Sequence, residues 1–367
     1  MAEVPHILSA RQFDEAQIAE IFERTNAMYA AFENDRRALA SRHVGYVLST
    51  SFYEASTRTR KSHEAAAAQL GMGVITTENA KEFSSAVKGE TIRDTTLTEA
   101  QLCDVILMRH YEEGAADIAA EVSPVPIING GDGPGEHPTQ ALLDLYTIYK
   151  EKGRTDDLHV VIGGDLIKGR TARSLAMLLS HYKNNHITFV SLPELRIDER
   201  VKSHLSEAGI SFEETTEMYD ALPQADVVYW TRLQLERHAR KTPADEAAVL
   251  RALQKIGARA AGAVLDSVKH NAAQALVEIG AISGEILDAD NTQEEMSAVS
   301  LARNYVIDQA ALQAMKGNAI IMHPLPRNNE ITETVDSDPR AKYFVQVRHG
   351  KFLRMALLDQ LLEKTAA

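Results

Sequence analysis

Residues 56–60, with the sequence STRTR, bring together side chains that bind oxyanions. They follow the strand-like HVGYVLSTSFY and lead the strong helix formers of KSHEAAAAQLG, so we expect them at the start of a helix. A helix N-terminus offers free N–H groups and a positive dipole end, and Arg58 can bind two oxygens of one anion. The glycines and the GK[ST] core of a P-loop are absent. Taken alone, the stretch fits an anion site or a capped helix with a solvated basic face.

Three more arginines stand at the carboxyl ends of predicted strands. Arg109 stands near the end of DVILMRH, Arg232 ends DVVYWTR, and Arg170 opens the helix that follows VVIGGDLIKG. In open parallel sheets these ends face the ligand crevice, so the three guanidinium groups are candidates for binding phosphate and carboxylate groups. The glycines before Arg170 do not form GxGxxG, which argues against a nicotinamide site. Each arginine by itself could also be structural.

His137 and Gln140 lie in the first turn of the predicted helix HPTQALLDLYTIYKEKG. Their spacing of three places them on one face of that helix. The helix N-terminus disfavours the cationic form of His137, and a neutral imidazole there can donate a hydrogen bond to a carbonyl oxygen. A buried histidine bonded to backbone is the alternative.

Two loops complete the set of candidates. In MHPLPRNNE, Pro324 and Pro326 restrict the backbone, which presents the carbonyl of Leu325 in a set direction. In SSAVKGET, Ser84 and Lys88 lie on a glycine-containing loop that could equally be a plain surface loop.

Composition limits the possible partners. The 367 residues carry 52 acidic and 39 basic side chains, a net charge of −13, so we expect no nucleic-acid or membrane partner and any anion site must be local. The single cysteine, Cys103, lies in the apolar LCDVILM and is predicted to be an inert core thiol. No apolar run approaches the length of a membrane span and no signal sequence is evident, so we expect a cytoplasmic protein, with a transit peptide that has been removed as the open alternative. The acidic LDADNTQEE lacks the glycine of a calcium loop.

Strand and helix patterns alternate through both halves of the chain, which predicts two open α/β domains with mainly parallel sheets. We expect residues 1–150 to form the first domain and 151–350 the second, with the boundary at the long helix over 137–152. The region 238–303 is alanine-rich, with two helical patterns, and differs from its surroundings.

The motifs STRTR, KGET, MRH, HPTQALLDLYTI, GDLIKGRTARSL, YWTRLQLER, HPLPR and DSDPRAKYF occur in an order that resembles the aspartate/ornithine carbamoyltransferase family. Within that family they are most similar to the catalytic chains of its aspartate-specific branch. The resemblance implies a carbamoyl-phosphate domain and an aspartate domain, with the C-terminal helix over 351–367 packing back on the first. It also implies transfer of a carbamoyl group from carbamoyl phosphate to L-aspartate in pyrimidine synthesis, without a cofactor or metal.

The resemblance further implies roles for individual residues. Carbamoyl phosphate is expected to contact Ser56, Thr57, Arg58, Thr59, Arg109, His137, Gln140, Pro324 and Leu325. Catalysis is expected to depend on Arg58, Thr59, Arg109 and His137. Aspartate is expected to contact Lys88, Arg170, Arg232, Gln234 and Leu325. Ser84 and Lys88 match a loop that enters the site of a neighbouring subunit, which implies a homotrimer with shared active sites.

The chain departs from the family pattern at two places. His63 stands where phenylalanine is usual, and we expect it to be neutral, hydrogen-bonded and compatible with catalysis. The region 238–303 is longer than usual and is either a surface elaboration or a docking surface for a regulatory chain or a pathway enzyme. Two other functions stay open: an ornithine-type carbamoyltransferase and a non-catalytic scaffold. The loop HPLP and the Arg-x-Gln at 232–234 favour aspartate over ornithine.

Overall fold

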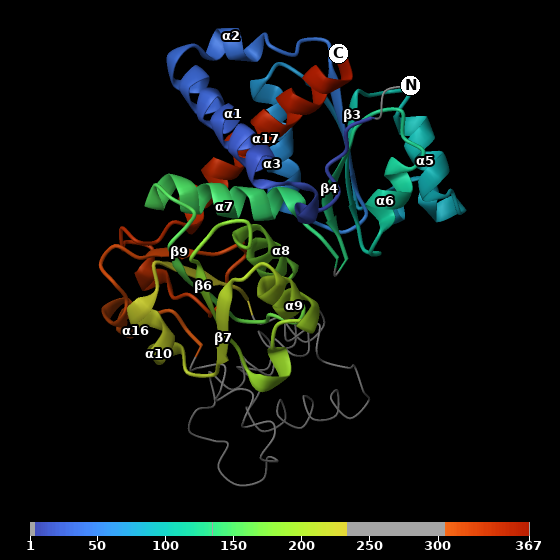
Figure 1. The fold of residues 1–367 in the computed structure, drawn as a ribbon. Coiled ribbons are helices and arrows are strands. Elements are labelled where there is room, and N and C mark those ends of the chain that lie inside the picture. Colours follow the sequence, from blue (N-terminus) through green and yellow to red (C-terminus); the bar gives the residue numbers. More distant parts are fainter. Residues whose placement is uncertain (1–3, 134, 233–304, 367) are drawn as a thin grey trace, which may run out of the picture.

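The structure, a computed structural model, describes residues 4–133, 135–232 and 305–366 (Figure 1). Within them the chain forms two parallel sheets, each covered by helices, which confirms the predicted fold class. Gln234 and the region 238–303 lie outside the described residues.

The first sheet has the strand order β2-β1-β3-β4. Its strands are β1 (Val47–Phe52), β2 (Gly73–Glu78), β3 (Val105–His110) and β4 (Ile127–Asp132). The inner strands β1 and β3 are almost entirely buried; the run VILM in β3 predicts this, whereas β1 also buries Ser49, Thr50 and Ser51. The edge strand β2 is mostly exposed.

Helices cover both faces of this sheet (Figure 1). They are α1 (Glu15–Asn34), α2 (Arg36–Ala40), α3 (Thr57–Gln69), α4 (Ala80–Phe83), α5 (Ile92–Glu99), α6 (Ala115–Ala120) and α7 (Pro138–Lys152). The side chain of Asp14 accepts a hydrogen bond from the backbone N–H of Gln17 in a capping box, which fixes the start of α1. α7 ends at Gly153, which has a φ of +72°.

The second sheet has the order β7-β6-β5-β8-β9. Its strands are β5 (His159–Gly163), β6 (His186–Val190), β7 (Ser211–Thr215), β8 (Val227–Trp230) and β9 (Ile320–Met322). Its helices are α8 (Arg170–Leu179), α9 (Glu199–Glu207), α10 (Met218–Ala221) and α16 (Gln309–Ala314). Five short 3-10 turns complete the described elements, namely η1 (Ala10–Gln12), η2 (Ser85–Lys88), η3 (Pro193–Leu195), η4 (Leu222–Gln224) and η5 (Glu333–Val335).

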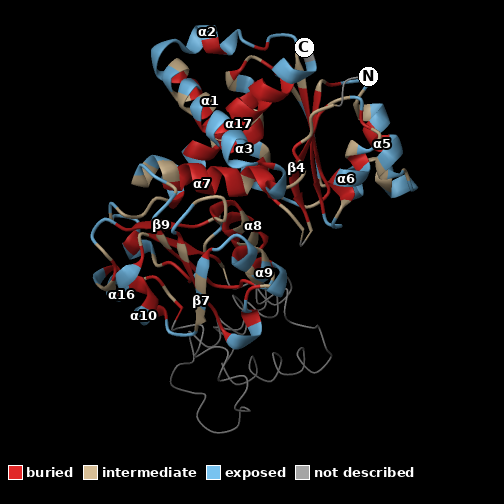
Figure 2. Cartoon of the chain, viewed as in Figure 1, coloured by how far each residue is buried: buried red, intermediate tan, exposed pale blue. Residues whose placement is uncertain are grey.

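The C-terminal helix α17 (Tyr343–Ala366) returns to the first sheet and packs on α1, α3 and α7. It begins at Tyr343, eight residues before the predicted start at 351. Figure 2 shows α7 and α17 buried along much of their length, because one continuous apolar core runs from the first sheet through α7 to α8 and the second sheet. None of the described helices is long and apolar enough to cross a membrane.

Candidate active site

A cavity of about 440 Å³ opens at the carboxyl ends of both sheets. Its walls are the segments that follow β1, β5, β8 and β9, together with Arg109 near the end of β3 and the first turn of α7. In each sheet the strand order reverses direction beside a central strand, between β1 and β3 and between β5 and β8. Ligands of open α/β sheets bind at such switch points, and here two of them face one cavity.

The structure brings most of the predicted site residues together around this cavity. Those that line it are Ser56, Thr57, Arg58, Thr59, Arg109, His137, Gln140, Arg170, Arg232, Pro324 and Leu325. Ser84 and Lys88 do not line it.

The start of α3 forms one wall and is open to an anion. Ser56 is the N-cap residue, yet its side chain makes no capping hydrogen bond to the helix. The first-turn N–H groups and the Ser56 hydroxyl are therefore available for a ligand. Burial, followed by the nearby cations Arg109 and Arg232, lowers the pKa of Arg58. A bound phosphate would relieve this repulsion, since it places negative charge among the three guanidinium groups.

Two further guanidinium groups meet at the end of β4. Arg109 donates to the carbonyl of Gly130 over 3.0 Å, and Arg170 donates to the carbonyl of Gly133. Between them, Gly131 has a φ of +112°, and a Cβ there would lie 2.7 Å from Nη1 of Arg109 and 2.9 Å from Nη2 of Arg170. The glycine thus gives both arginines room to approach the same backbone.

His137 lies at the N-terminus of α7, where it is 4% exposed. Its Nε2 is 3.2 Å from Oγ1 of Thr59, and its Nδ1 is buried without a hydrogen-bond partner among the described residues. Burial, followed by the cations Arg170 and Arg109, holds the pKa of His137 well below its usual range. This direction agrees with the predicted neutral imidazole, which can donate a hydrogen bond but brings no positive charge.

Gln140 is held by a buried carboxylate that sequence reasoning missed. Its Nε2 donates to Oδ1 of Asp144 over 2.8 Å. Asp144 also accepts hydrogen bonds from the hydroxyl of Tyr229 at 2.7 Å and from Nε2 of Gln346 at 2.5 Å. Burial raises the pKa of Asp144 to about 7. One side chain of α7 therefore ties a cavity residue to β8 and to α17.

The loop after β9 is fixed by hydrogen bonds on both sides of His323. Leu325 donates its backbone N–H to Nδ1 of His323 over 2.7 Å, so the ring proton lies on Nε2, 2.9 Å from Oε1 of Glu330. The backbone N–H of His323 donates to Oε1 of Gln346 over 3.1 Å. Leu325 has a φ of +53°, and these contacts hold it in that conformation. The loop that the sequence predicts to be rigid is therefore restricted by the hydrogen bonds of His323 as well as by its prolines.

Two predicted residues, Ser84 and Lys88, lie outside the cavity. Ser84 stands between α4 and η2, where its hydroxyl donates to the carbonyl of Ala80 and accepts from the N–H of Ala86. Lys88 is exposed at the end of η2. A role for both in a neighbouring subunit's site stays a prediction, as does the role of Gln234, which lies outside the described residues.

Several cavity residues carry no prediction from the sequence, namely Glu54, Lys168, Thr171 and Thr231. Oε2 of Glu54 is 3.3 Å from Nη2 of Arg109, which places an acid beside the arginine cluster. Glu54, Lys168 and Thr231 lie within five residues of the end of β1, β5 or β8, whereas Thr171 lies in the first turn of α8, beside Arg170. The rule that selected the arginines, polar residues just after a strand, would have found the first three.

Two expectations outside the cavity are confirmed. Cys103 is buried with its thiol directed at the carbonyl of Glu99, and burial raises its pKa to about 12, so the thiol is inert at neutral pH. His63 is 1% exposed, with Nδ1 2.8 Å from the carbonyl of Thr59. Burial holds its pKa well below the usual range, so it is neutral and hydrogen-bonded.

Together these contacts define what the cavity can do. The four lining arginines offer bidentate donors to phosphate and carboxylate oxygens. Thr59 and the neutral His137 lie beside them and can donate to an oxygen that gains negative charge during a reaction. The arrangement suits a group transfer between two anionic substrates.

Comparisons with known proteins point the same way. The family model of the carbamoyl-P binding domain of aspartate/ornithine carbamoyltransferase matches residues 5–150, and that of the Asp/Orn binding domain matches 241–361. The chain is 40% identical to the chloroplastic aspartate carbamoyltransferase of Arabidopsis thaliana, over 98% of this chain and 78% of the relative.

Solved structures agree. The catalytic subunit of M. jannaschii aspartate transcarbamoylase is 36% identical and superposes with a TM-score of 0.77, covering 98% of both chains. Aspartate transcarbamoylase from Trypanosoma cruzi, in complex with carbamoyl phosphate and aspartate, is 30% identical with a TM-score of 0.74, covering 97% of this chain and 96% of that one. The cavity and these comparisons together establish that the chain belongs to the aspartate/ornithine carbamoyltransferase family.

Proposed function

We propose that the chain transfers the carbamoyl group of carbamoyl phosphate to the amine of L-aspartate, giving N-carbamoyl-L-aspartate and phosphate for pyrimidine biosynthesis. The observation that carries this function is the arginine-lined cavity at the switch points of both sheets. One sheet supplies the start of α3 for a phosphate, and the other supplies arginines for carboxylates. Relatives that align over nearly the whole chain are named for the same activity.

The phosphate of carbamoyl phosphate binds at the start of α3, in this proposal, through Ser56, Thr57, Arg58 and Thr59. Ser56 makes no capping bond to the helix, so its hydroxyl is free to turn to a ligand. Arg58 adds a guanidinium whose positive charge is disfavoured in the empty cluster and favoured by an anion. Charge on the phosphate increases as it leaves, so these contacts strengthen during the reaction.

The carbonyl oxygen of the carbamoyl group faces Thr59, Arg109 and His137. The amine nitrogen of aspartate attacks the carbonyl carbon, and negative charge moves to that oxygen until the bond to phosphate breaks. His137 is neutral, and its Nε2 lies beside Thr59. The imidazole can therefore donate a hydrogen bond to the carbonyl oxygen without carrying a positive charge. The amine proton passes to the departing phosphate. Gln140 lies by the carbamoyl NH₂ group. The backbone carbonyls of Pro324 and Leu325 accept hydrogen bonds from that NH₂ group.

Aspartate binds to the other half of the cavity, with its carboxylates on Arg170, Arg232 and Gln234. Arg170 is 8% exposed and anchored on the carbonyl of Gly133, so its direction is fixed before substrate arrives. Two arginines suit a second carboxylate and would repel the side-chain ammonium of ornithine. The charge of the cavity therefore favours aspartate over the ornithine-type alternative, and the intact set of lining residues argues against a scaffold.

The two halves correspond to two domains in this proposal. Residues 1–150 form the carbamoyl-phosphate domain, on which the C-terminal helix packs, and 151–350 form the aspartate domain. Holding the two substrates on separate sheets lets the domains bring the amine against the carbonyl carbon. We propose a cytoplasmic location for the activity, and we propose that 238–303 is either a surface elaboration or a docking segment for a regulatory or pathway partner.

Phosphate release tests the reaction. Purified protein is supplied with carbamoyl phosphate and either L-aspartate or L-ornithine, and N-carbamoyl-L-aspartate is identified by mass spectrometry. We expect saturable turnover with aspartate and none above background with ornithine. Turnover with ornithine alone would support the ornithine-type alternative. No turnover with either amino acid would support the non-catalytic scaffold.

A homotrimer with shared sites is the second part of the proposal. Lys88 is exposed and lies outside its own chain's cavity, as a residue supplied to a neighbour must. Mixing inactive Lys88→Ala chains with inactive His137→Ala chains should restore activity after refolding, because about a quarter of the sites then draw both intact residues. Mixtures of the chains that stay inactive, although they assemble as the wild type does, would contradict shared sites.

A further inference from the structure

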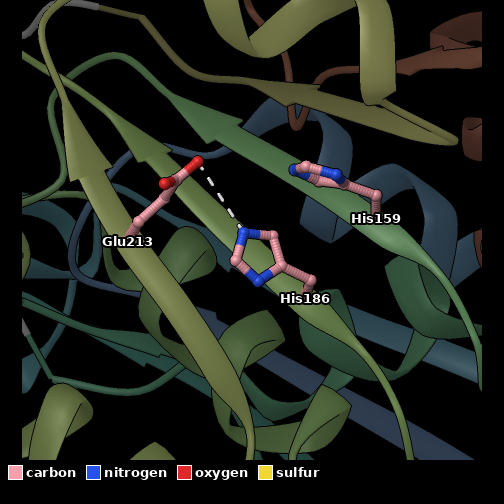
Figure 3. Close-up of side chains that lie close together, drawn as sticks. All are labelled: His159, His186 and Glu213. Carbon is pink, nitrogen blue, oxygen red and sulfur yellow. Dashed lines mark ion pairs between the residues drawn. The ribbon is translucent and has the colours of Figure 1, made fainter.

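Three neighbouring strands bring together a cluster of side chains of the kinds that bind metals, two at the amino-terminal ends of their strands and one in the middle of its strand (Figure 3). His159 begins β5, His186 begins β6, and Glu213 lies in β7. One ligand atom from each can be chosen so that all three lie within 4.8 Å of one another. Two imidazoles and a carboxylate are the donor set that zinc and related first-row ions prefer.

The strand register explains why these side chains meet. His159 is paired with His186, and Thr188 with Glu213, so all of them point to the same face of the sheet. Adjacent strands of the sheet are hydrogen-bonded, which makes the backbone under the cluster rigid. Sites built on strands hold their ligands more reliably than sites on loops.

The cluster is separate from the active site. The active-site cavity opens at the carboxyl ends of the strands and includes none of the three residues. Further along the sheet, Val161 of β5 and Val190 of β6 join an apolar core with Leu222. The sheet therefore changes from apolar to polar toward its amino-terminal end, where His159 and His186 are half-buried and Glu213 is exposed.

Hydrogen bonds already orient the ligand atoms. Nδ1 of His186 is 2.8 Å from Oγ of Ser211, and its Nε2 is 3.7 Å from Oε1 of Glu213. When Nδ1–H donates to Ser211, the lone pair lies on Nε2, the atom that faces the carboxylate; histidine ligands are oriented in this way in metal sites. The hydroxyl of Thr188 donates to Glu213 over 3.0 Å and lies 2.8 Å from Nε2 of His159.

We propose that His159, His186 and Glu213 bind a divalent first-row transition-metal ion, with Zn²⁺ as the best match, and that the ion clamps β5, β6 and β7 together. Tetrahedral zinc with ligands near 2 Å needs donor atoms about 3.3 Å apart, so the partly exposed side chains must move inward by about 1 Å. The ring proton of His159 moves from Nε2 to Nδ1, so Nε2 exchanges its hydrogen bond to Thr188 for the metal, and the Thr188 hydroxyl stays on the carboxylate as an outer contact. Water takes the fourth position. Lys316 and Asp226 lie nearby, but they form an ion pair whose opposite charges offset each other.

Zinc titration calorimetry tests the proposal on the full chain, after treatment with EDTA and dialysis into buffer without phosphate. Glu213→Gln is the first variant, because the carboxylate of Glu213 is accessible and its replacement should leave the fold intact; His186→Ala is the second. His204→Ala is the matched control, since His204 is a histidine on α9 that pairs with Ser180 rather than with this cluster.

We expect the wild type and His204→Ala to bind one zinc ion per chain with micromolar affinity and to melt several degrees higher with zinc. Binding should weaken about tenfold or more in Glu213→Gln and His186→Ala, with little zinc-dependent change in their melting temperature. Carbamoyl transfer by the EDTA-treated wild type should be unchanged. Equal zinc affinity in the cluster variants and the control, or no saturable binding by the wild type, would overturn the proposal.

Discussion

Replacing Asp144 with asparagine should change how the stability of the protein depends on pH. Asp144 is fully buried, and burial outweighs its three hydrogen bonds and the nearby Arg354, raising its pKa from 3.8 to about 7. Between about pH 4 and pH 7 the folded chain therefore keeps a proton that the unfolded chain has lost. The free energy of unfolding must fall as pH rises through this window and become level above pH 7.

The size of the effect follows from the pKa shift. A shift of about 3 units at about 1.36 kcal/mol each amounts to about 4 kcal/mol, most of it lost between pH 5 and pH 7. The amide introduced by Asp144→Asn cannot ionise, and its oxygen can still accept from Gln140 and Gln346. The advantage of the variant over the wild type should therefore grow by roughly 3 kcal/mol between pH 4.5 and pH 7.5. Because Gln140 keeps its partner, turnover should change little.

Urea unfolding at a series of pH values measures this effect, at one fixed protein concentration. Trp230 is the only tryptophan and is fully buried on β8, next to Tyr229, so its fluorescence reports on the region of interest. Asp156→Asn, at an exposed aspartate, is the matched control and should follow the wild type. A difference between wild type and Asp144→Asn that does not vary with pH would refute the reasoning, because Asp144 would then be ionised in the folded protein throughout.

Three other changes have distinct expected outcomes. Arg58→Ala should reduce kcat/KM by roughly 10²- to 10⁴-fold, since two charge-assisted bonds to phosphate at about 1.5–3 kcal/mol each are lost; near-normal kinetics in a protein with an unchanged circular-dichroism spectrum would count against its role. Gly131→Ala should lower turnover by about tenfold or more, because its Cβ would displace both Arg109 and Arg170; wild-type rates would show that these arginines tolerate movement. His63→Phe should keep turnover and raise stability by about 1 kcal/mol, because it removes a buried Nε2 without a partner among the described residues. The pKa of His63 is lowered, so its stability contribution is present above about pH 6.5 and lost on acidification; the variant should unfold less readily in acid, and equal acid sensitivity would contradict this.

The convergence of the arginines could be predicted from the sequence, because it depends on local patterns and one rule of parallel sheets. Arg109 and Arg232 stand directly after buried aliphatic runs, and carboxyl ends of parallel strands share an edge. The start of α3 is equally local, since STRTR separates a strand pattern from a helix pattern. Glu54 and Lys168 follow from the same rule, although the sequence analysis did not select them.

Asp144 could not be predicted in this way. In ALLDLY it reads as an ordinary polar position of a helix, and it becomes buried because Tyr229 and Gln346 arrive from segments 85 and 202 residues away. The metal-binding cluster depends in the same way on strand register, which no local pattern specifies. The proposed role of Lys88 depends on a second copy of the chain, so it cannot be tested in the structure of one chain.

A crystal structure with N-(phosphonacetyl)-L-aspartate, a ligand present in a related structure from Trypanosoma cruzi, tests most directly whether the cavity is a two-substrate site. The phosphonate should lie at the start of α3 on Arg58, the amide carbonyl oxygen should lie within hydrogen-bond distance of Thr59 and His137, and the carboxylates should lie on Arg170 and Arg232. Binding in another place, or in this cavity with the carboxylates at α3 and the phosphonate on Arg232, would contradict the assignment of the two halves.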